Sequence, residues 1–283
     1  MSAGLLFALA AAPCWAALDA QRKALARHLG PLPLFTLLIL GQIPLYLAWS
    51  LSEGLARPAP AYLGPGVADA ALNLVAQLLF VGAVRVSPLS LTIPMLSLTP
   101  VFAVGTGWLF LAERPGPVQA AGIAAVVAGA AILQSGGGLQ GLWRERGVWM
   151  MTGVAACWSM TMVFDKLCLR AASVPTHALL QALGMAAGAV SLLALRRELR
   201  SLSAAWPHRG LLAFAAITAC AATGLQLFAV ERILVSLVEA IKRAFGLAAS
   251  VVNGRVFFGE PITGRKVAAI AVMGAGVVTL LLG

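Results

Sequence analysis

The chain is a succession of apolar windows about 20 residues long, separated by short polar or Gly/Pro-rich links. A helix of that length spans a hydrocarbon core about 30 Å thick. The windows lack the alternation of a membrane barrel, and backbone groups in lipid must bond within the segment, which favours helices. They lie at residues 3–22, 31–50, 67–85, 88–111, 117–134, 147–168, 176–195, 209–229, 233–257 and 264–282. The pattern predicts an all-α integral membrane protein with ten transmembrane helices.

Composition agrees with this pattern and excludes other classes. The 283 residues are 60% hydrophobic and 11% charged, whereas soluble domains carry about 25% charged residues. The net charge of +10 does not indicate nucleic-acid binding, because the Lys and Arg residues lie between apolar runs without interleaved aromatics. The four cysteines lie in apolar segments without a CxxC motif, so we interpret them as packing residues.

An internal repeat divides the chain. CWAALDAQRK (14–23) and CWSMTMVFDK (157–166) share Cys-Trp, seven intervening residues and then a lysine. Residues 106–133 and 253–280 share Gly-x-x-Phe-x-x-Glu followed by an apolar run. We therefore expect two five-helix copies, at residues 1–138 and 139–283. Because each copy crosses the membrane an odd number of times, the second copy enters from the opposite side and is inverted. We expect a binding site near the midplane, between the two copies.

Two five-helix halves, each ending in Gly-x-x-Phe-x-x-Glu and a small-residue helix, resemble the EamA-type family of the drug/metabolite transporter superfamily. The segment 87–115 is similar to the fourth helix of that family's repeat, and the resemblance covers essentially the whole chain. It implies a transporter, and an exporter, because family members export amino acids, metabolites and drugs. It does not indicate one substrate.

The ninth window carries the strongest binding candidates. Lys242 and Arg243 fall near the predicted midplane, and Glu239 lies three and four residues before them, within side-chain reach on a helix. The first copy has Met95 and Leu96 at the matching positions, so the scaffold does not require these charges. We expect a cationic anchor for a carboxylate or phosphate. The alternative is a self-contained ion cluster that locks the helix to its neighbours.

The third window carries Asp69, Asn73 and Gln77 four residues apart, which places them in one stripe on a helix. Such a stripe lines a water-filled path or bonds to neighbouring helices. Asp69 falls in the predicted first turn, where the helix dipole also favours a carboxylate.

Two positions of the first repeat motif are further candidates. Trp15 and Trp158 lie near the middle of their helices, where they wall a cavity or fill space. Lys23 and Lys166 lie about 12 Å further along, toward opposite faces of an inverted pair. They are gate residues or snorkelling lysines. Asp165 precedes Lys166 and is a candidate coupling residue.

The fourth window is interrupted by prolines. Pro94 removes a helical hydrogen bond and is a candidate hinge, and Ser97 follows it as a candidate substrate contact. Glu113 and Glu260 lie at helix-end turns of the two copies, and we interpret both as structural.

Two lines of argument give opposite orientations of the chain in the membrane. Of 15 Lys/Arg residues outside the membrane windows, 11 lie in odd-numbered links. The positive-inside rule then places those links in the cytoplasm and both termini outside. The resemblance implies termini inside. We expect the bacterial inner (plasma) membrane in either case.

These observations favour a secondary transporter that moves a small polar, anionic or zwitterionic metabolite by alternating access. The chain has no Walker-type phosphate loop, nucleophile–base arrangement or metal-ligand cluster, and its three histidines lie near predicted loops. We therefore expect no enzyme and no cofactor. The expected partners are a small-molecule substrate and membrane lipid. Two questions stay open: whether a proton is coupled to transport through Asp69, Glu239 or Asp165, and whether the protein forms a homodimer.

Three alternatives remain at the level of sequence. A flippase for lipid-linked precursors would share the fold and add an apolar lateral groove. A cationic drug exporter would also share it. A scaffold or sensor that moves nothing predicts that the three charges of the ninth window satisfy one another in a dry core.

Overall fold

The computed structural model describes residues 2–87, 92–134, 145–258 and 263–282, and most of these residues are helical. They form ten α-helices and three 3-10 segments, without a strand. The α-helices are α1 (Ala3–Leu25), α2 (Pro31–Ser52), α3 (Leu63–Val86), α5 (Thr99–Leu111), α6 (Pro117–Gln134), α7 (Arg146–Leu169), α8 (Val174–Leu195), α9 (Arg209–Arg232), α10 (Val235–Phe258) and α11 (Gly264–Leu282). The 3-10 segments are η1 (Pro60–Tyr62), η2 (Ile93–Leu98) and η5 (Leu199–His208).

Seven segments of the described chain are long and apolar enough to cross a membrane. They contain α1, α2, α3, α7, α8, α9 and α11, while α5 and α6 are apolar but shorter. In α10, three charged side chains interrupt the apolar run. The protein is therefore an all-α integral membrane protein.

Two of the expected helices differ from the observed ones. The fourth is not continuous: η2 is a 3-10 segment, and α5 begins only at Thr99. The second residue of each segment is a proline, Pro94 and Pro100, which lacks the N–H group that a continuous helix would use. The third helix begins at Leu63 instead of residue 67, so Asp69 lies in its second turn and not in the first. The dipole explanation for Asp69 is therefore wrong.

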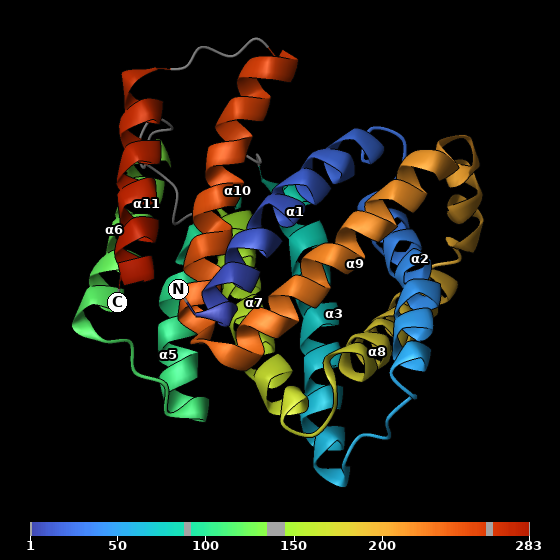
Figure 1. Cartoon of the computed structure of the whole chain (residues 1–283). Coiled ribbons are helices and arrows are strands. Elements are labelled where there is room, and N and C mark those ends of the chain that lie inside the picture. The colour runs from blue at the N-terminus through green and yellow to red at the C-terminus, as the bar shows by residue number, and fades with distance from the viewer. Residues whose placement is uncertain (1, 88–91, 135–144, 259–262, 283) are drawn as a thin grey trace.

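The two halves of the chain pack against each other in a reciprocal pattern. α1 packs on α9 and α10, while α7 packs on α3, η2 and α5 (Figure 1). α2 pairs with α8, and α6 pairs with α11. Each of these contacts thus either has a counterpart with the halves exchanged or joins equivalent helices of the two halves. The core is formed between the halves and not within either one.

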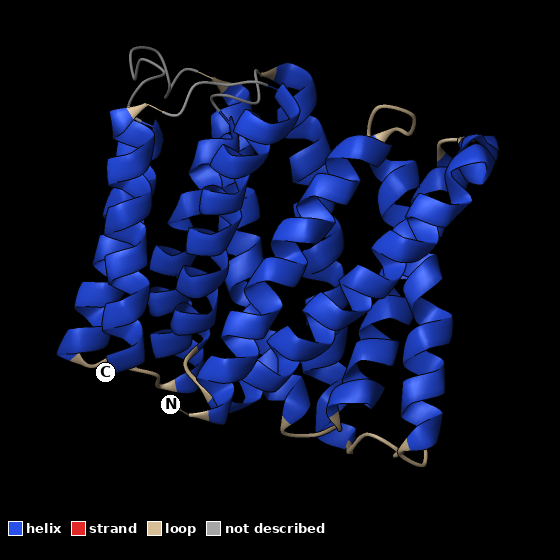
Figure 2. Ribbon diagram, turned by 45° about the horizontal axis from the view of Figure 1, so that its top comes forward, coloured by secondary structure: helices blue, strands red, loops and turns tan. Residues whose placement is uncertain are grey.

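Both chain termini lie at the same face of the helix layer, which we call the terminus face (Figure 2). The α2–α3, α7–α8 and α9–α10 links also lie there, and the α1–α2 link lies at the opposite, distal face. The C-terminal end of α7 and the N-terminal ends of α3, α8 and α10 therefore meet at the terminus face.

The closest helix pair is α6 with α11, where glycines allow the backbones to touch. A Cβ atom at Gly276 would lie 2.8 Å from the Gly122 carbonyl oxygen and 2.9 Å from the Val126 nitrogen. A Cβ at Gly129 would lie 2.8 Å from the Ala269 carbonyl oxygen. Small residues at such positions are the usual means of close helix contact in membranes.

We predict that Gly276→Ala lowers stability by about 1–3 kcal/mol, because the new methyl group meets backbone atoms that cannot rotate away. Thermal unfolding in detergent measures the loss. Gly274→Ala is the matched control, since no atom lies within 4 Å of a Cβ there. Equal melting temperatures for the two variants would contradict the predicted packing.

Candidate functional site

Three of the four charged residues of α10 form one ion cluster. Glu239 is fully buried, and its carboxylate contacts the Lys242 ammonium and, at 3.7 Å, the Arg243 Nη2. The two cations remain partly accessible, with 21% of the Lys242 side chain and 17% of the Arg243 side chain exposed. The cluster keeps a net charge of +1, and its accessible part is cationic.

Helices from both halves surround these cations. Lys242 Nζ donates to Gln226 Oε1 of α9 at 3.2 Å, and it lies 5.5 Å from the centre of the Trp15 ring on α1. Arg243 Nη2 donates to Thr99 Oγ1 of α5 at 3.2 Å. Lys242 lies about 6 Å along α10 from the helix centre, toward the terminus face, and so less centrally than we expected. We call Trp15, Thr99, Gln226, Glu239, Lys242 and Arg243 the α10 site.

Two N–H groups at the α10 site are left without a partner. Trp15 Nε1 and Arg243 Nε are buried, and neither has a hydrogen-bond acceptor among the described residues. A buried donor without an acceptor costs about 1–3 kcal/mol, so such groups call for an explanation. Both are donors and both lie beside accessible cations, which suits an anionic ligand that brings the missing acceptors.

The corresponding place in the other half is apolar. Trp158 of α7 lies 6.2 Å from the Phe80 ring and packs, with Met95, on a cluster that includes Leu96. Met95 and Leu96 are the repeat counterparts of Lys242 and Arg243. Ser97 is buried in η2 beside this cluster. The two halves therefore share a fold but not a charge pattern.

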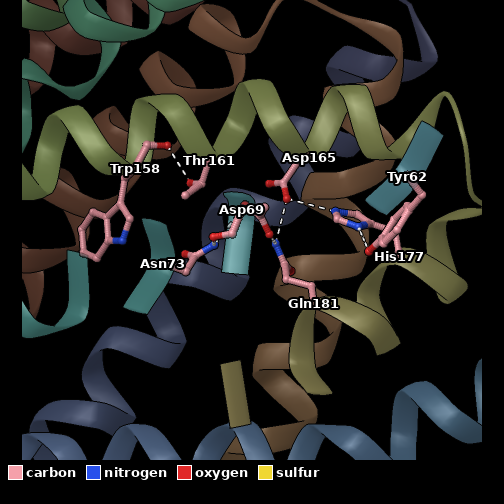
Figure 3. Close-up of polar contacts among 8 residues, drawn as sticks. All are labelled: Tyr62, Asp69, Asn73, Trp158, Thr161, Asp165, His177 and Gln181. Atoms are coloured by element: carbon pink, nitrogen blue, oxygen red, sulfur yellow. Dashed lines mark hydrogen bonds and ion pairs between the residues drawn. The ribbon is translucent and has the colours of Figure 1, made fainter. Parts of the chain in front are cut away.

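A second polar cluster joins α3, α7, α8 and η1 (Figure 3). Its residues are Tyr62, Asp69, Asn73, Asp165, His177 and Gln181, and we call it the α3–α7–α8 cluster. Gln181 Nε2 donates to Asp69 Oδ2 at 2.8 Å and to Asp165 Oδ1 at 2.7 Å. His177 Nε2 lies 3.0 Å from Asp165 Oδ1, and the Tyr62 hydroxyl lies 2.9 Å from His177 Nδ1.

Only part of the predicted polar stripe of α3 belongs to this cluster. Asn73 Nδ2 donates to Asp69 Oδ1 at 3.1 Å and so belongs to it. Gln77 is half-buried one turn further along α3. Asp69 is fully buried and 4% of Asp165 is exposed, so neither faces water directly.

The same cluster has the size of a metal site, since ligand atoms of Asp69, Asp165 and His177 lie within 4.8 Å of one another. However, the amide nitrogen of Gln181 sits between the two carboxylates and directs its hydrogens at both. A cation in that space would meet an N–H donor. We therefore do not assign these residues as metal ligands.

The predicted gate residue Lys166 ties three segments together at the terminus face. Its ammonium donates to Glu113 Oε1 at 2.5 Å and to the Ile233 carbonyl oxygen at 2.7 Å. Glu113 Oε2 accepts from the Val235 backbone nitrogen at 2.9 Å, at the start of α10. α7, the end of α5 and the α9–α10 turn thus meet at one contact, which we call the Lys166 tie.

The structure does not test the roles of the remaining predicted residues. Lys23 is exposed near the end of α1 at the distal face. The backbone of Pro94 lies in η2, and Glu260 lies outside the described residues. The roles of these residues stay predictions.

Comparison with known proteins identifies the family. The model of the EamA-like transporter family matches residues 2–134 and again residues 145–282. The chain belongs to the EamA-like transporter family. This family comprises transporters and not enzymes.

The comparison with solved structures supports the fold and says nothing of the function. A solved structure described only as the crystal structure of a protein is similar over 99% of this EamA chain and 96% of its own length, with a TM-score of 0.79 and 19% identity. No curated protein matches significantly.

The sequence pattern does not single out several residues that the structure places in the two sites of this EamA protein. Thr99 and Gln226 are ordinary polar residues in apolar windows, and only the fold brings them to α10. His177 was set aside because it lies near a loop, yet it is fully buried. The Gln181 amide, four residues after His177 on the same helix face, was the available signal.

We predict that Lys166→Met and Glu113→Gln each destabilise the protein by about 3 kcal/mol, because each leaves the other group of a largely buried pair uncompensated. The double variant should lose less than the sum of the single losses. Thermal unfolding in detergent measures all three variants. The exposed Asp19–Arg22 pair, cycled the same way, should show almost no coupling. Additive losses for Lys166 and Glu113 would contradict the tie.

Proposed function

We propose that this EamA-family protein is a secondary transporter that moves a small anionic or zwitterionic metabolite across the membrane by alternating access. The observation that carries the proposal is the α10 site, where accessible cations lie beside unpartnered N–H donors between helices of both halves. A carboxylate or phosphate would accept from the Arg243 guanidinium and the Trp15 indole while Lys242 supplies charge.

The transporter architecture belongs to the same proposal. We propose that the ten helices all cross the membrane as two inverted five-helix repeats. The double family match and the reciprocal packing of the halves support this arrangement. A binding site between inverted repeats is the usual plan of secondary transporters. We further propose the bacterial inner membrane as its location and export as its direction.

The ion cluster alone does not decide between transporter and scaffold, because both interpretations predict that Glu239 pairs with the cations. The exposed fractions separate them. A purely structural cluster would be dry throughout, whereas here the carboxylate is buried and both cations keep accessible surface. That asymmetry supports a binding role.

The Lys166 tie supports the alternating-access part of the proposal. It joins α7 of one half to the end of α5 in the other, and also reaches the turn that begins α10. Movement of the halves at the terminus face therefore requires this contact to open. The tie acts as a closing contact on one side of the α10 site.

One observation favours the second candidate, a lipid-linked precursor flippase. A cavity of about 450 Å³ lies between α1, α2 and α9, and its wall is almost entirely apolar. Its residues are Phe7, Leu45, Tyr46, Trp49, Ile217, Cys220, Ala221, Gly224, Leu225 and Phe228. Such a groove suits an acyl or polyprenyl chain.

We predict that small carboxylates or phosphates raise the melting temperature of the purified protein in a metabolite panel. Binding at a hundred times Kd stabilises a folded protein by about 2.7 kcal/mol. The Lys242→Ala/Arg243→Ala variant should lose the response, because it removes the charges that recognise the anion. Arg196→Ala/Arg200→Ala is the matched control, since it removes two exposed cations far along the chain from the site.

The outcomes separate the candidates. Stabilisation by free anions in the parent and the Arg196/Arg200 control, but not in the α10 variant, supports the metabolite transporter. A response only to a lipid-linked phosphate would favour the flippase. A response to lipophilic amines that survives in the α10 variant would contradict the anion site and favour a drug exporter. Flux in proteoliposomes of either orientation then tests the export direction.

A further inference from the structure

The α3–α7–α8 cluster carries two carboxylates without a matching cation. Among the described residues, their hydrogen-bond partners are the amides of Asn73 and Gln181 and the imidazole of His177. No lysine or arginine is among these partners. Two buried carboxylates this close repel each other when both are charged, so a proton shared by the pair lowers the cost of burying them. The pair therefore offers a place where one proton can bind and from which it can leave.

The hydrogen bonds of the cluster allow that proton to move. A neutral imidazole accepts at one nitrogen and donates at the other, whereas an imidazolium donates at both. Tyr62 and Asp165 occupy the two nitrogens of His177 at 2.9 and 3.0 Å. With either protonation state the heavy atoms keep their places, because the Tyr62 hydroxyl can donate or accept. A proton can thus pass without rearrangement of the helices.

The line of contacts leads to the aqueous surface. Tyr62 lies in η1 at the terminus face, directly after the exposed link 53–59. From there the contacts run through His177 and Asp165 to the Gln181 amide and Asp69 (Figure 3). The contacts through Tyr62 and His177 thus offer a proton a path from the terminus face to Asp165, while the Gln181 amide only donates hydrogen bonds to Asp165 and Asp69.

Resting on the transport function proposed above, we propose that the α3–α7–α8 cluster is the site at which a coupling proton binds. In the loaded state one carboxyl of the Asp69–Asp165 pair carries the proton and His177 is neutral. On release the proton moves to His177, then through the Tyr62 hydroxyl to water, and the carboxyl becomes a carboxylate. One proton is transferred, and no redox partner is needed.

Geometry links this site to the transport cycle through α7. Asp165 and Lys166 are consecutive, so one turn of α7 faces the cluster and also holds the Lys166 tie. A change of charge at Asp165 therefore acts on the turn of α7 that also carries the tie. By reciprocity, opening or closing of the tie is expected to change proton binding at the cluster.

The other titratable groups near the cluster are few. The Tyr62 phenol on η1, the Cys168 thiol on α7 and the His177 imidazole on α8 face the two carboxylates. Lys242 on α10 acts at longer range. None of these is a fixed cation in direct contact with Asp69 or Asp165 in the described residues, so a proton remains the counter-charge.

Infrared spectroscopy of the protein reconstituted in lipid tests the proposal without a substrate. We expect a C=O stretching band of a protonated carboxyl that falls as the pH is raised. Asp69→Asn and Asp165→Asn should each remove or shift this band, because each breaks the shared pair. Asp19→Asn is the matched control, since it changes an exposed aspartate of α1 and should leave the band unchanged.

Two milder variants keep the test decisive if an Asp69 or Asp165 variant does not fold. His177→Gln should move the pH midpoint of the band, because it removes the exchanging partner of Asp165. Tyr62→Phe should leave the midpoint nearly in place but slow the hydrogen–deuterium exchange of the carboxyl, because it interrupts the path to water.

Three results would overturn the proposal: no protonated-carboxyl band at any pH at which the protein is folded, a band that persists at an unchanged frequency in both Asp variants, or thermal stabilisation by ZnCl2 or MnCl2 that Asp165→Asn abolishes. The last result would indicate a metal site. Because the infrared measurement needs no substrate, it can fail while anion binding at the α10 site succeeds, and the converse also holds.

Discussion

Inside the hydrocarbon layer a polar side chain that faces lipid finds no water, so most such groups find their partners within the protein. This constraint decides where the two halves of the chain touch. Glu113 of the first half holds Lys166 of the second, Asp69 is bound by Gln181, and Thr99 accepts from Arg243. Each contact crosses between the halves. A movement of one half against the other must therefore exchange these partners, which makes them suitable points of control.

The two halves share a fold but have diverged in charge. Lys242 of α10 stands where the other half has Met95, and Asp165 of α7 stands where the other half has Arg22. The cationic site lies among α1, α5, α9 and α10, and the acidic cluster lies among α3, α7 and α8. Reciprocal helix pairs have thus acquired opposite charges. That division would place the proposed anion-binding and proton-binding sites on one pseudo-symmetric scaffold, with α7 contributing to both the acidic cluster and the Lys166 tie.

Much of the fold could be predicted from the sequence because membrane helices follow directly from apolar length. The observed helices begin and end within a few residues of most windows, and the double family match covers both copies. The residues of the two candidate sites were harder to predict from the sequence. Glu239, Lys242 and Arg243 are visible because charges in an apolar window are costly. Gln226 and Gln181 were not, because an amide in such a window is common and its partner lies on another helix. His177 was dismissed for its place near a loop, although a helix end can still be buried by its neighbours.

The central claim is that the accessible face of the α10 cations is reached by water and solutes, and cysteine labelling in the membrane tests it most directly. In a chain whose four native cysteines are replaced, Lys242→Cys should react with a small cationic thiosulfonate, because reaction needs a hydrated thiolate and restores the lost charge. Ile241→Cys, one residue away and fully buried, should not react. The account predicts rapid labelling at 242 alone. Equal inertness at 241 and 242, from either side of the membrane, would show a dry structural cluster and contradict a transport site there.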